Sequence, residues 1–189
     1  ILMFTPYNAI RHCEQQGDFL PSAALMANLY VALFQAAVER QADGTYQTKD
    51  AELEKVLQKL KNRGEGIGGH WVNTLVDWGG QQVIHYPQDA DFPEHGGKHS
   101  INTSHSRTAL GFDRTDFRDE TLADALTVNN KRRYLQNYTG LPDPTVLISL
   151  AEYYGKTARN WISSSQGTMA AWLGCDLIVN FSLYADSNL

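Results

Sequence analysis

The sequence predicts an α+β fold, because two helical patterns and a strong β-hairpin pattern follow one another within 189 residues. Residues 23–38 form a long apolar run of helical length. Residues 48–60 place leucine and valine at the i, i+3, i+4 and i+7 positions of an amphipathic helix. Residues 68–89 hold two β-branched and aromatic segments around Gly79-Gly80, which is typical of a hairpin. The length suits a single domain spanning residues 1–189.

The two helices should differ in their surroundings. The first begins near Pro21, and apolar side chains surround nearly the whole helix, so we expect it to be packed on several sides. A polar connection with a turn at Asp43-Gly44 leads to the second helix. That helix opens at Thr48 or Asp50, and its single apolar face should lie on another element.

The hairpin turn fixes a register. If Trp78 pairs with Gln81 across a two-glycine turn of positive φ, the numbers of paired residues sum to 159. Asp89 then lies opposite His70, with Cβ atoms roughly 4.5–5.5 Å apart. A carboxylate at that distance would orient the imidazole and stabilise its protonated form, as a catalytic base requires.

The middle of the chain is less regular. Residues 91–116 are polar and include His95, His99 and His105, but their spacing lacks a zinc pattern, so we expect a functional or mobile loop and no metal site. We expect an irregular insertion over about residues 91–142, with a short helix near 119–128. A further helix should open with Asp143 as N-cap and Pro144 in its first turn, and stop at Gly155.

Composition limits the partners and the compartment. The net charge is −5, and the one basic cluster, residues 131–133, is expected to be solvated, so nucleic acid is not an expected partner. No signal peptide is evident, and the longest apolar run is too short and too polar to span a bilayer. We therefore expect no membrane association. Two cysteines suit a soluble protein in a reducing compartment, the cytoplasm or nucleus.

Cys175 heads the apolar run of residues 174–185, which periodicity allows as a buried helix or a buried strand. A thiol at a helix N-terminus has a lowered pKa, and an imidazole beside it completes a nucleophile for acyl transfer. Three further motifs accompany it: His70-Trp71 opening the hairpin, the segment 19–21 leading into the first helix, and Gln166 upstream of the cysteine.

In this motif order the chain resembles the Ulp1/SENP cysteine peptidases, relatives of adenovirus proteinase and of the YopJ-type acyltransferases. The resemblance implies a papain-like fold with a mixed sheet flanked by helices. It implies a thiol hydrolase that cleaves an isopeptide or C-terminal peptide bond of a ubiquitin-like modifier, or another peptide substrate, without a cofactor. Cys175 would be the nucleophile, His70 the base and Asp89 its orienting group. Gln166 would bind the oxyanion, and Trp71 would wall the substrate channel.

The chain departs from the family pattern at several positions, and alternatives stay open. Gln88 or Asp91 could replace Asp89 as the third catalytic member. Asp176 follows the cysteine where the family has glycine, which favours a non-catalytic binding module. An NlpC-like or C39-like peptidase would instead use Cys13 as nucleophile with His70 as base. A YopJ-like acetyltransferase would share the triad.

Overall fold

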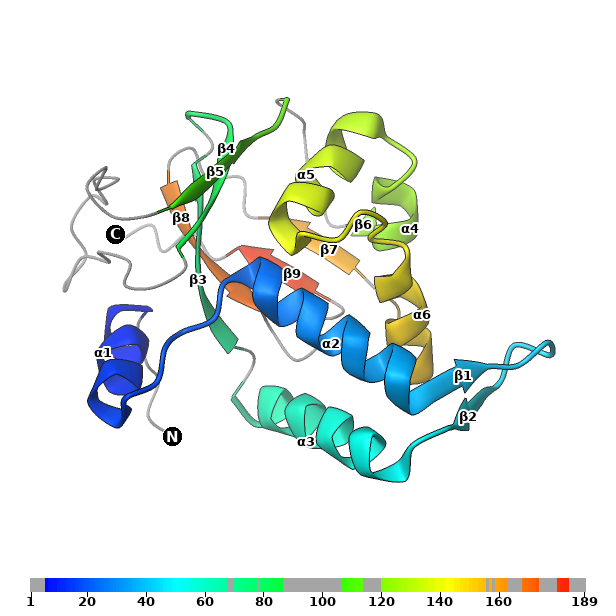
Figure 1. Ribbon diagram of the computed structural model, residues 1–189. Helices are drawn as coiled ribbons and strands as arrows, with labels where there is room; N and C mark the ends of the chain where they lie inside the picture. Colours follow the sequence, from blue (N-terminus) through cyan, green and yellow to red (C-terminus); the bar gives the residue numbers. More distant parts are fainter. Residues whose placement is uncertain are drawn as a thin grey trace.

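The computed structural model describes residues 6–67, 70–77, 79–86, 107–113, 120–155, 157, 159–162, 168–173 and 180–183. Within these ranges the chain forms six helices and nine strands, so the α+β class is confirmed (Figure 1). None of the helices in the same ranges is both long and apolar enough to cross a membrane.

Seven strands form one sheet in the order β5-β4-β3-β8-β9-β7-β6. Neighbours run antiparallel except β7 and β9, which are parallel, so the sheet is mixed. Helix α2 crosses one face of this sheet in Figure 1 and contacts β3, β8 and helix α5. The strands are β3 (His70–Asp77), β4 (Gln82–His85), β5 (Thr108–Gly111), β6 (Glu120–Thr121), β7 (Arg159–Ile162), β8 (Thr168–Leu173) and β9 (Asn180–Leu183).

The hairpin forms in the expected register but with a different turn. Asp77 pairs with Gln82 and Thr74 with His85, so paired residue numbers sum to 159 as predicted. The glycine pair does not supply the positive φ; Gln81 does, at 53°. The Asp77 carboxylate accepts a hydrogen bond from the Gly80 N–H at 2.9 Å, which holds the wider turn together without glycine in a left-handed conformation.

The β3–β8 ladder is interrupted between Trp71 and Leu75, where β3 has more residues than its partner. The chain that leads into α2 attaches at this irregularity. The Asn73 N–H donates to the Pro21 carbonyl at 2.8 Å, and the Ala23 N–H donates to Thr74 Oγ1 at 2.9 Å. The start of α2 is therefore fixed to the middle of β3.

Helix α2 (Ala23–Ala37) begins after Ser22, whose side chain accepts a hydrogen bond from the Leu25 N–H. One face of the helix is buried, but Leu25 and Leu29 are exposed. The expectation that α2 is packed on several sides is therefore confirmed in part: three other helices and the sheet strands β3 and β8 contact it, but the side that carries Leu25 and Leu29 is exposed. Its apolar composition is compatible with this exposed side because alanine occupies part of it.

Helix α3 (Ala51–Ile67) packs against α2 and is joined to it by a small hairpin of β1 (Val38–Arg40) and β2 (Tyr46–Thr48). Asp50 is the capping residue of the two candidates, because its Oδ1 accepts hydrogen bonds from the backbone N–H groups of Glu52 and Leu53. The polar connection expected here is thus a β-hairpin that turns at Asp43-Gly44.

The expected irregular insertion contains regular structure. Helix α5 (Asn129–Thr139) buries Tyr134, Leu135 and Tyr138, an i, i+1, i+4 pattern that makes one apolar face on an otherwise polar helix. It ends at Gly140, which has φ 64°. Strands β5 and β6 also fall within the stretch, so the description of residues 91–142 as irregular is wrong for its described part.

Two shorter helices complete the described fold. Helix α4 (Leu122–Ala125) lies within the short helix expected near residues 119–128 and is capped by Thr121, whose Oγ1 accepts a hydrogen bond from the Asp124 N–H. Helix α6 (Val146–Tyr153) starts later than expected. Asp143 Oδ1 accepts from the Thr145 N–H, and the turn that follows is tighter than an α-turn, because the Leu147 N–H donates to the Pro144 carbonyl three residues back.

Candidate functional site

The residues expected to form a catalytic site lie at one end of β3 and in segments outside the described residues. His70 and Trp71 are the first two residues of β3, and only their backbone is described. Asp89, Gln166 and Cys175 fall outside the described ranges, as do the alternatives Gln88 and Asp91. The same holds for His95, His99, His105 and Asp176.

Strand β8 ends next to His70, at a residue that precedes Cys175 by two positions in the sequence. His70 pairs with Leu173, and Trp71 pairs with Trp172 across the antiparallel ladder. Leu173 is the last residue of β8 and precedes Cys175 by two residues. The apolar run behind the cysteine ends in a strand, since β9 occupies Asn180–Leu183 and pairs with β7 and β8.

The other end of β8 lies far from His70. Thr168, the first residue of β8, pairs with Asp77 at the turn end of the hairpin. Asp77 is seven residues along β3 from His70, which corresponds to roughly 20 Å of strand. Gln166 precedes Thr168 by two residues in the sequence and lies outside the described residues, so its role as an oxyanion group stays a prediction.

Cys13, the alternative nucleophile, lies within helix α1 (Pro6–Gln16) and is partly buried. Burial raises the pKa of its thiol, and the negative charge of Asp18 raises it further. Its position in the last half of the helix also keeps it away from the positive end of the helix dipole. These conditions reduce the thiolate fraction, so the environment of Cys13 does not favour nucleophilic catalysis.

The most completely defined polar group near the hairpin is centred on His85, which the sequence analysis did not single out. His85 Nδ1 lies 2.8 Å from Thr74 Oγ1, and Nε2 lies 2.8 Å from the backbone carbonyl oxygen of Asn137. Thr74 Oγ1 also accepts the hydrogen bond from the Ala23 N–H. This chain of hydrogen bonds joins the start of α2, the hairpin and the last turn of α5.

The partners of His85 determine which ring nitrogen carries the proton. A carbonyl oxygen only accepts, so Nε2 carries hydrogen and donates to Asn137. In the neutral ring Nδ1 is then an acceptor, and the Thr74 hydroxyl donates to it. Burial lowers the pKa of His85, and the Asn137 carbonyl opposes this effect only in part. The ring is therefore neutral at pH 7.

Two engaged nitrogens and an exposure of only 8% give His85 a structural rather than a catalytic role. The sequence did contain a signal for this group. The register that is expected to place Asp89 opposite His70 also places His85 opposite Thr74, nearer the turn of the hairpin. Polar side chains directly opposite each other on an antiparallel pair are close enough to form a hydrogen bond.

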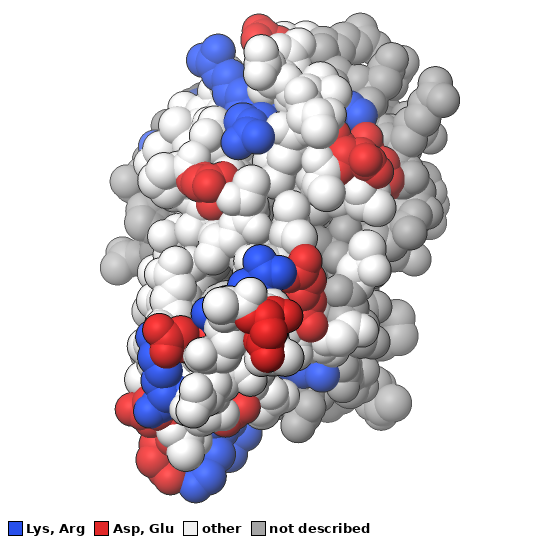
Figure 2. Space-filling view, turned by 90° about the vertical axis from the view of Figure 1, so that its right-hand side faces the viewer, with Lys and Arg blue, Asp and Glu red and all other residues white. Residues whose placement is uncertain are grey.

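Charged groups on the described surface are mixed in sign. In Figure 2 the lysine and arginine side chains alternate with aspartate and glutamate over the face shown. The basic run expected to be solvated is partly neutralised: Lys131 pairs with Glu120 and is largely buried, and Arg132 lies 3.9 Å from Asp143. Among the described side chains, no group of three or more His, Cys, Asp or Glu could hold a metal ion.

Comparison of the chain with models of protein families, with curated proteins and with solved structures finds no match in any of the three.

Proposed function

We propose that the chain is a thiol hydrolase of the Ulp1 type, with a papain-like arrangement in which Cys175 is the nucleophile and His70 its base. The observation that supports this most directly is the pairing of His70 with Leu173, two residues before Cys175. His70 and Leu173, which are 103 positions apart in the sequence, are thereby neighbours at one end of the sheet.

Chain connectivity limits the separation of the proposed pair. Paired Cα atoms in an antiparallel ladder lie about 4.5–5.5 Å apart, and two further residues span at most about 7 Å, so the His70 and Cys175 Cα atoms lie within about 12 Å. This limit is compatible with direct contact between thiol and imidazole.

In the proposed reaction His70 takes the thiol proton as Cys175 attacks the substrate carbonyl, and it returns the proton to the leaving amine. A thioester to Cys175 forms as the C–N bond breaks, and water then hydrolyses it. Asp89 would orient His70, because the register of the hairpin extends as far as the hydrogen bond from the Tyr86 N–H to the Asn73 carbonyl, in line with a pairing of residues 70 and 89. The substrate would be a ubiquitin-like modifier joined through its C-terminus.

The test is labelling of the purified chain with ubiquitin-type and SUMO-type probes that carry a C-terminal electrophile, followed by peptide mass spectrometry. We expect an adduct on Cys175 that is abolished by Cys175→Ala and by His70→Ala and retained in Cys13→Ser. An adduct on Cys13 would support the reversed order of nucleophile and base. If neither thiol of the folded parent chain reacts with either probe, the proposal is wrong and a binding module is favoured.

A further inference from the structure

We propose that His85 is an acid-sensitive latch that holds the open end of the β3–β4 hairpin against helices α2 and α5, and that protonation of its ring releases this end. The proposal rests on the position of His85 in the sheet, on its two hydrogen-bond partners and on the charges around it. It concerns a conformational change and does not depend on the proposed hydrolase activity.

His85 is placed where a local release is possible. It forms the last pair of the β3–β4 ladder with Thr74 and the last pair of the β4–β5 ladder with Thr108. The other residue pairs of both ladders lie between His85 and the hairpin turn. A movement of His85 therefore disrupts only the strand ends and leaves the rest of both ladders intact. The strand ends that it secures are those nearest His70 in β3.

A second proton breaks the hydrogen-bond chain. In the protonated ring both nitrogens are donors, so Nδ1 would donate to Thr74 Oγ1. The Thr74 hydroxyl already accepts from Ala23, so its own hydrogen would lose the acceptor that it has in the neutral state. Thr74 is fully buried, and an unpaired hydroxyl donor at such a position is destabilising.

The surroundings offer little to stabilise a charged ring. Helix α2 carries no charged residue. In the described part of the chain, the pKa of His85 is lowered by burial and raised by the hydrogen bond to the Asn137 carbonyl. The Tyr134 and Tyr138 phenols on α5 are neutral at pH 7, as phenols ordinarily are, and burial raises the pKa of each further. The titratable and charged residues on the described elements around His85 are Tyr30 on α2, His70 and Asp77 on β3, Tyr86 after β4, Arg107 before β5, and Lys131, Arg132, Arg133, Tyr134 and Tyr138 on α5.

The sign of the pH effect follows from the lowered pKa. Between the folded-state pKa and the ordinary value near 6.5, the unfolded or released chain binds more protons than the latched chain. Stability contributed by the latch is therefore complete above about pH 6.5 and is lost as the pH falls through the folded-state pKa. Acid should release the hairpin end before it unfolds the whole sheet.

The experiment compares the parent with His85→Gln, because a glutamine amide can accept from Thr74 and donate to Asn137 without titrating. From pH 7.5 to 5.5 we expect the melting temperature of the parent to fall by about 3 °C more than that of the variant. His12→Gln, at an exposed position of α1, is the matched control and should keep the pH dependence of the parent. Equal pH dependence of the parent and His85→Gln would overturn the proposal.

Two measurements on the unmodified chain decide the question even if His85→Gln fails to fold. In NMR titrations the His85 ring should titrate below pH 6.5. Hydrogen exchange, corrected for the intrinsic pH effect, should show faster exchange of the Ala23 and Tyr86 amides at pH 5.5, with Leu75 and Val76 still protected. A ring that titrates at or above pH 6.5, or a loss of protection that is uniform along β3, would contradict the latch. Neither measurement uses a substrate, so the outcome of the electrophile labelling does not affect the test of this proposal.

Discussion

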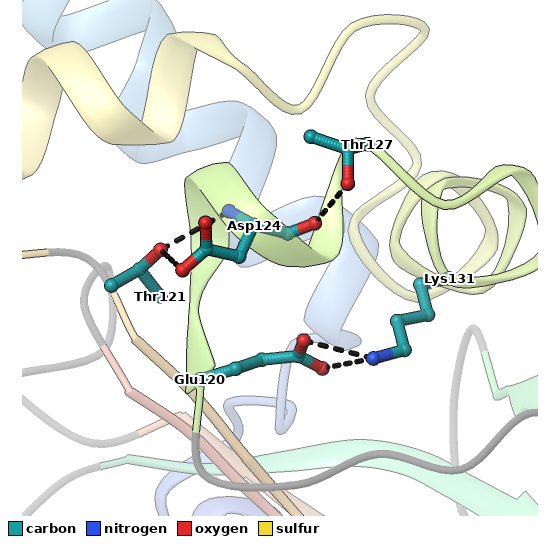
Figure 3. Close-up of polar contacts among 5 residues, drawn as sticks. All are labelled: Glu120, Thr121, Asp124, Thr127 and Lys131. Carbon is teal, nitrogen blue, oxygen red and sulfur yellow. Dashed lines mark hydrogen bonds and ion pairs between the residues drawn. The ribbon is translucent and has the colours of Figure 1, made fainter.

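Lys131 Nζ lies 2.6 and 2.8 Å from the two carboxylate oxygens of Glu120 and so joins the first turn of α5 to β6 (Figure 3). The lysine and glutamate side chains are only 13% and 18% exposed. Next to this pair, Thr121 and Asp124 cap α4 and the Thr127 hydroxyl donates to the Asp124 carbonyl. The edge strand β6 is only two residues long, so the ion pair and the cap hold it in place.

Replacing Lys131 by methionine should lower the free energy of unfolding by about 1–3 kcal/mol, because it leaves a largely buried carboxylate without its charged donor. Urea denaturation measures the change. Lys55→Met is the matched control: Lys55 forms a pair of the same 2.6 Å length with Glu52, but the two side chains are 64% and 81% exposed. We expect a loss below about 0.5 kcal/mol there. Equal losses in the two variants would show that burial does not strengthen the Lys131–Glu120 pair.

Gly140→Ala should destabilise the chain by two separate effects. Its φ of 64° is left-handed, which costs an L-residue roughly 1–2 kcal/mol, and an added Cβ would lie 2.9 Å from the Ala24 Cβ on α2. Gly155→Ala isolates the first effect, because Gly155 has φ 67° and nothing within 4 Å of an added Cβ. In thermal or urea unfolding Gly140→Ala should therefore lose more stability than Gly155→Ala. Equal losses would mean that α2 and α5 move apart easily at their contact, and a larger loss in Gly155→Ala would contradict the prediction.

The elements that sequence predicts well are those whose pattern is local. The hairpin register follows from alternation and a short turn, and α3 follows from its apolar spacing and from a capping Asp50. Helix α5 was missed because its face is made of tyrosine and leucine among charged and amide residues. The exposure of Leu25 and Leu29 also depends on which elements lie beside α2, and no local pattern reports that.

The candidate site was predictable only in its hairpin part. The approach of Leu173 to His70 depends on β8 pairing with β3, a contact between residues about a hundred positions apart. At the irregularity after Trp71 the Asn73 N–H donates to the Pro21 carbonyl, a contact between two distant segments that neither segment indicates on its own. The Thr74–His85 pair, by contrast, follows directly from the predicted register.

Gln81→Gly should stabilise the hairpin. Gln81 has φ 53°, the left-handed conformation that glycine adopts without a steric penalty, so the folded state gains while the more flexible unfolded chain offsets part of the gain. We expect an increase of about 0.5–1 kcal/mol in the free energy of unfolding. Gln82→Gly, one residue later within β4, should instead lower it, since glycine weakens a strand. A loss of stability in Gln81→Gly would indicate that the Gln81 side chain supports the turn.

Cys13 should react slowly with iodoacetamide, because the thiolate is the reactive form and burial together with Asp18 raises the pKa of the thiol. The Cys175→Ala background leaves Cys13 as the one thiol in the chain, so its rate can be read directly. At pH 7.5 we expect alkylation several-fold slower than that of a free cysteine peptide, and a faster rate in Asp18→Asn, which removes the second cause of the shift. His12→Gln, which changes the adjacent residue without adding a charge, should leave the rate near that of the parent. A Cys13 that reacts faster than the free peptide would show an activated thiol and would favour the reversed order, with Cys13 as the nucleophile and His70 as its base.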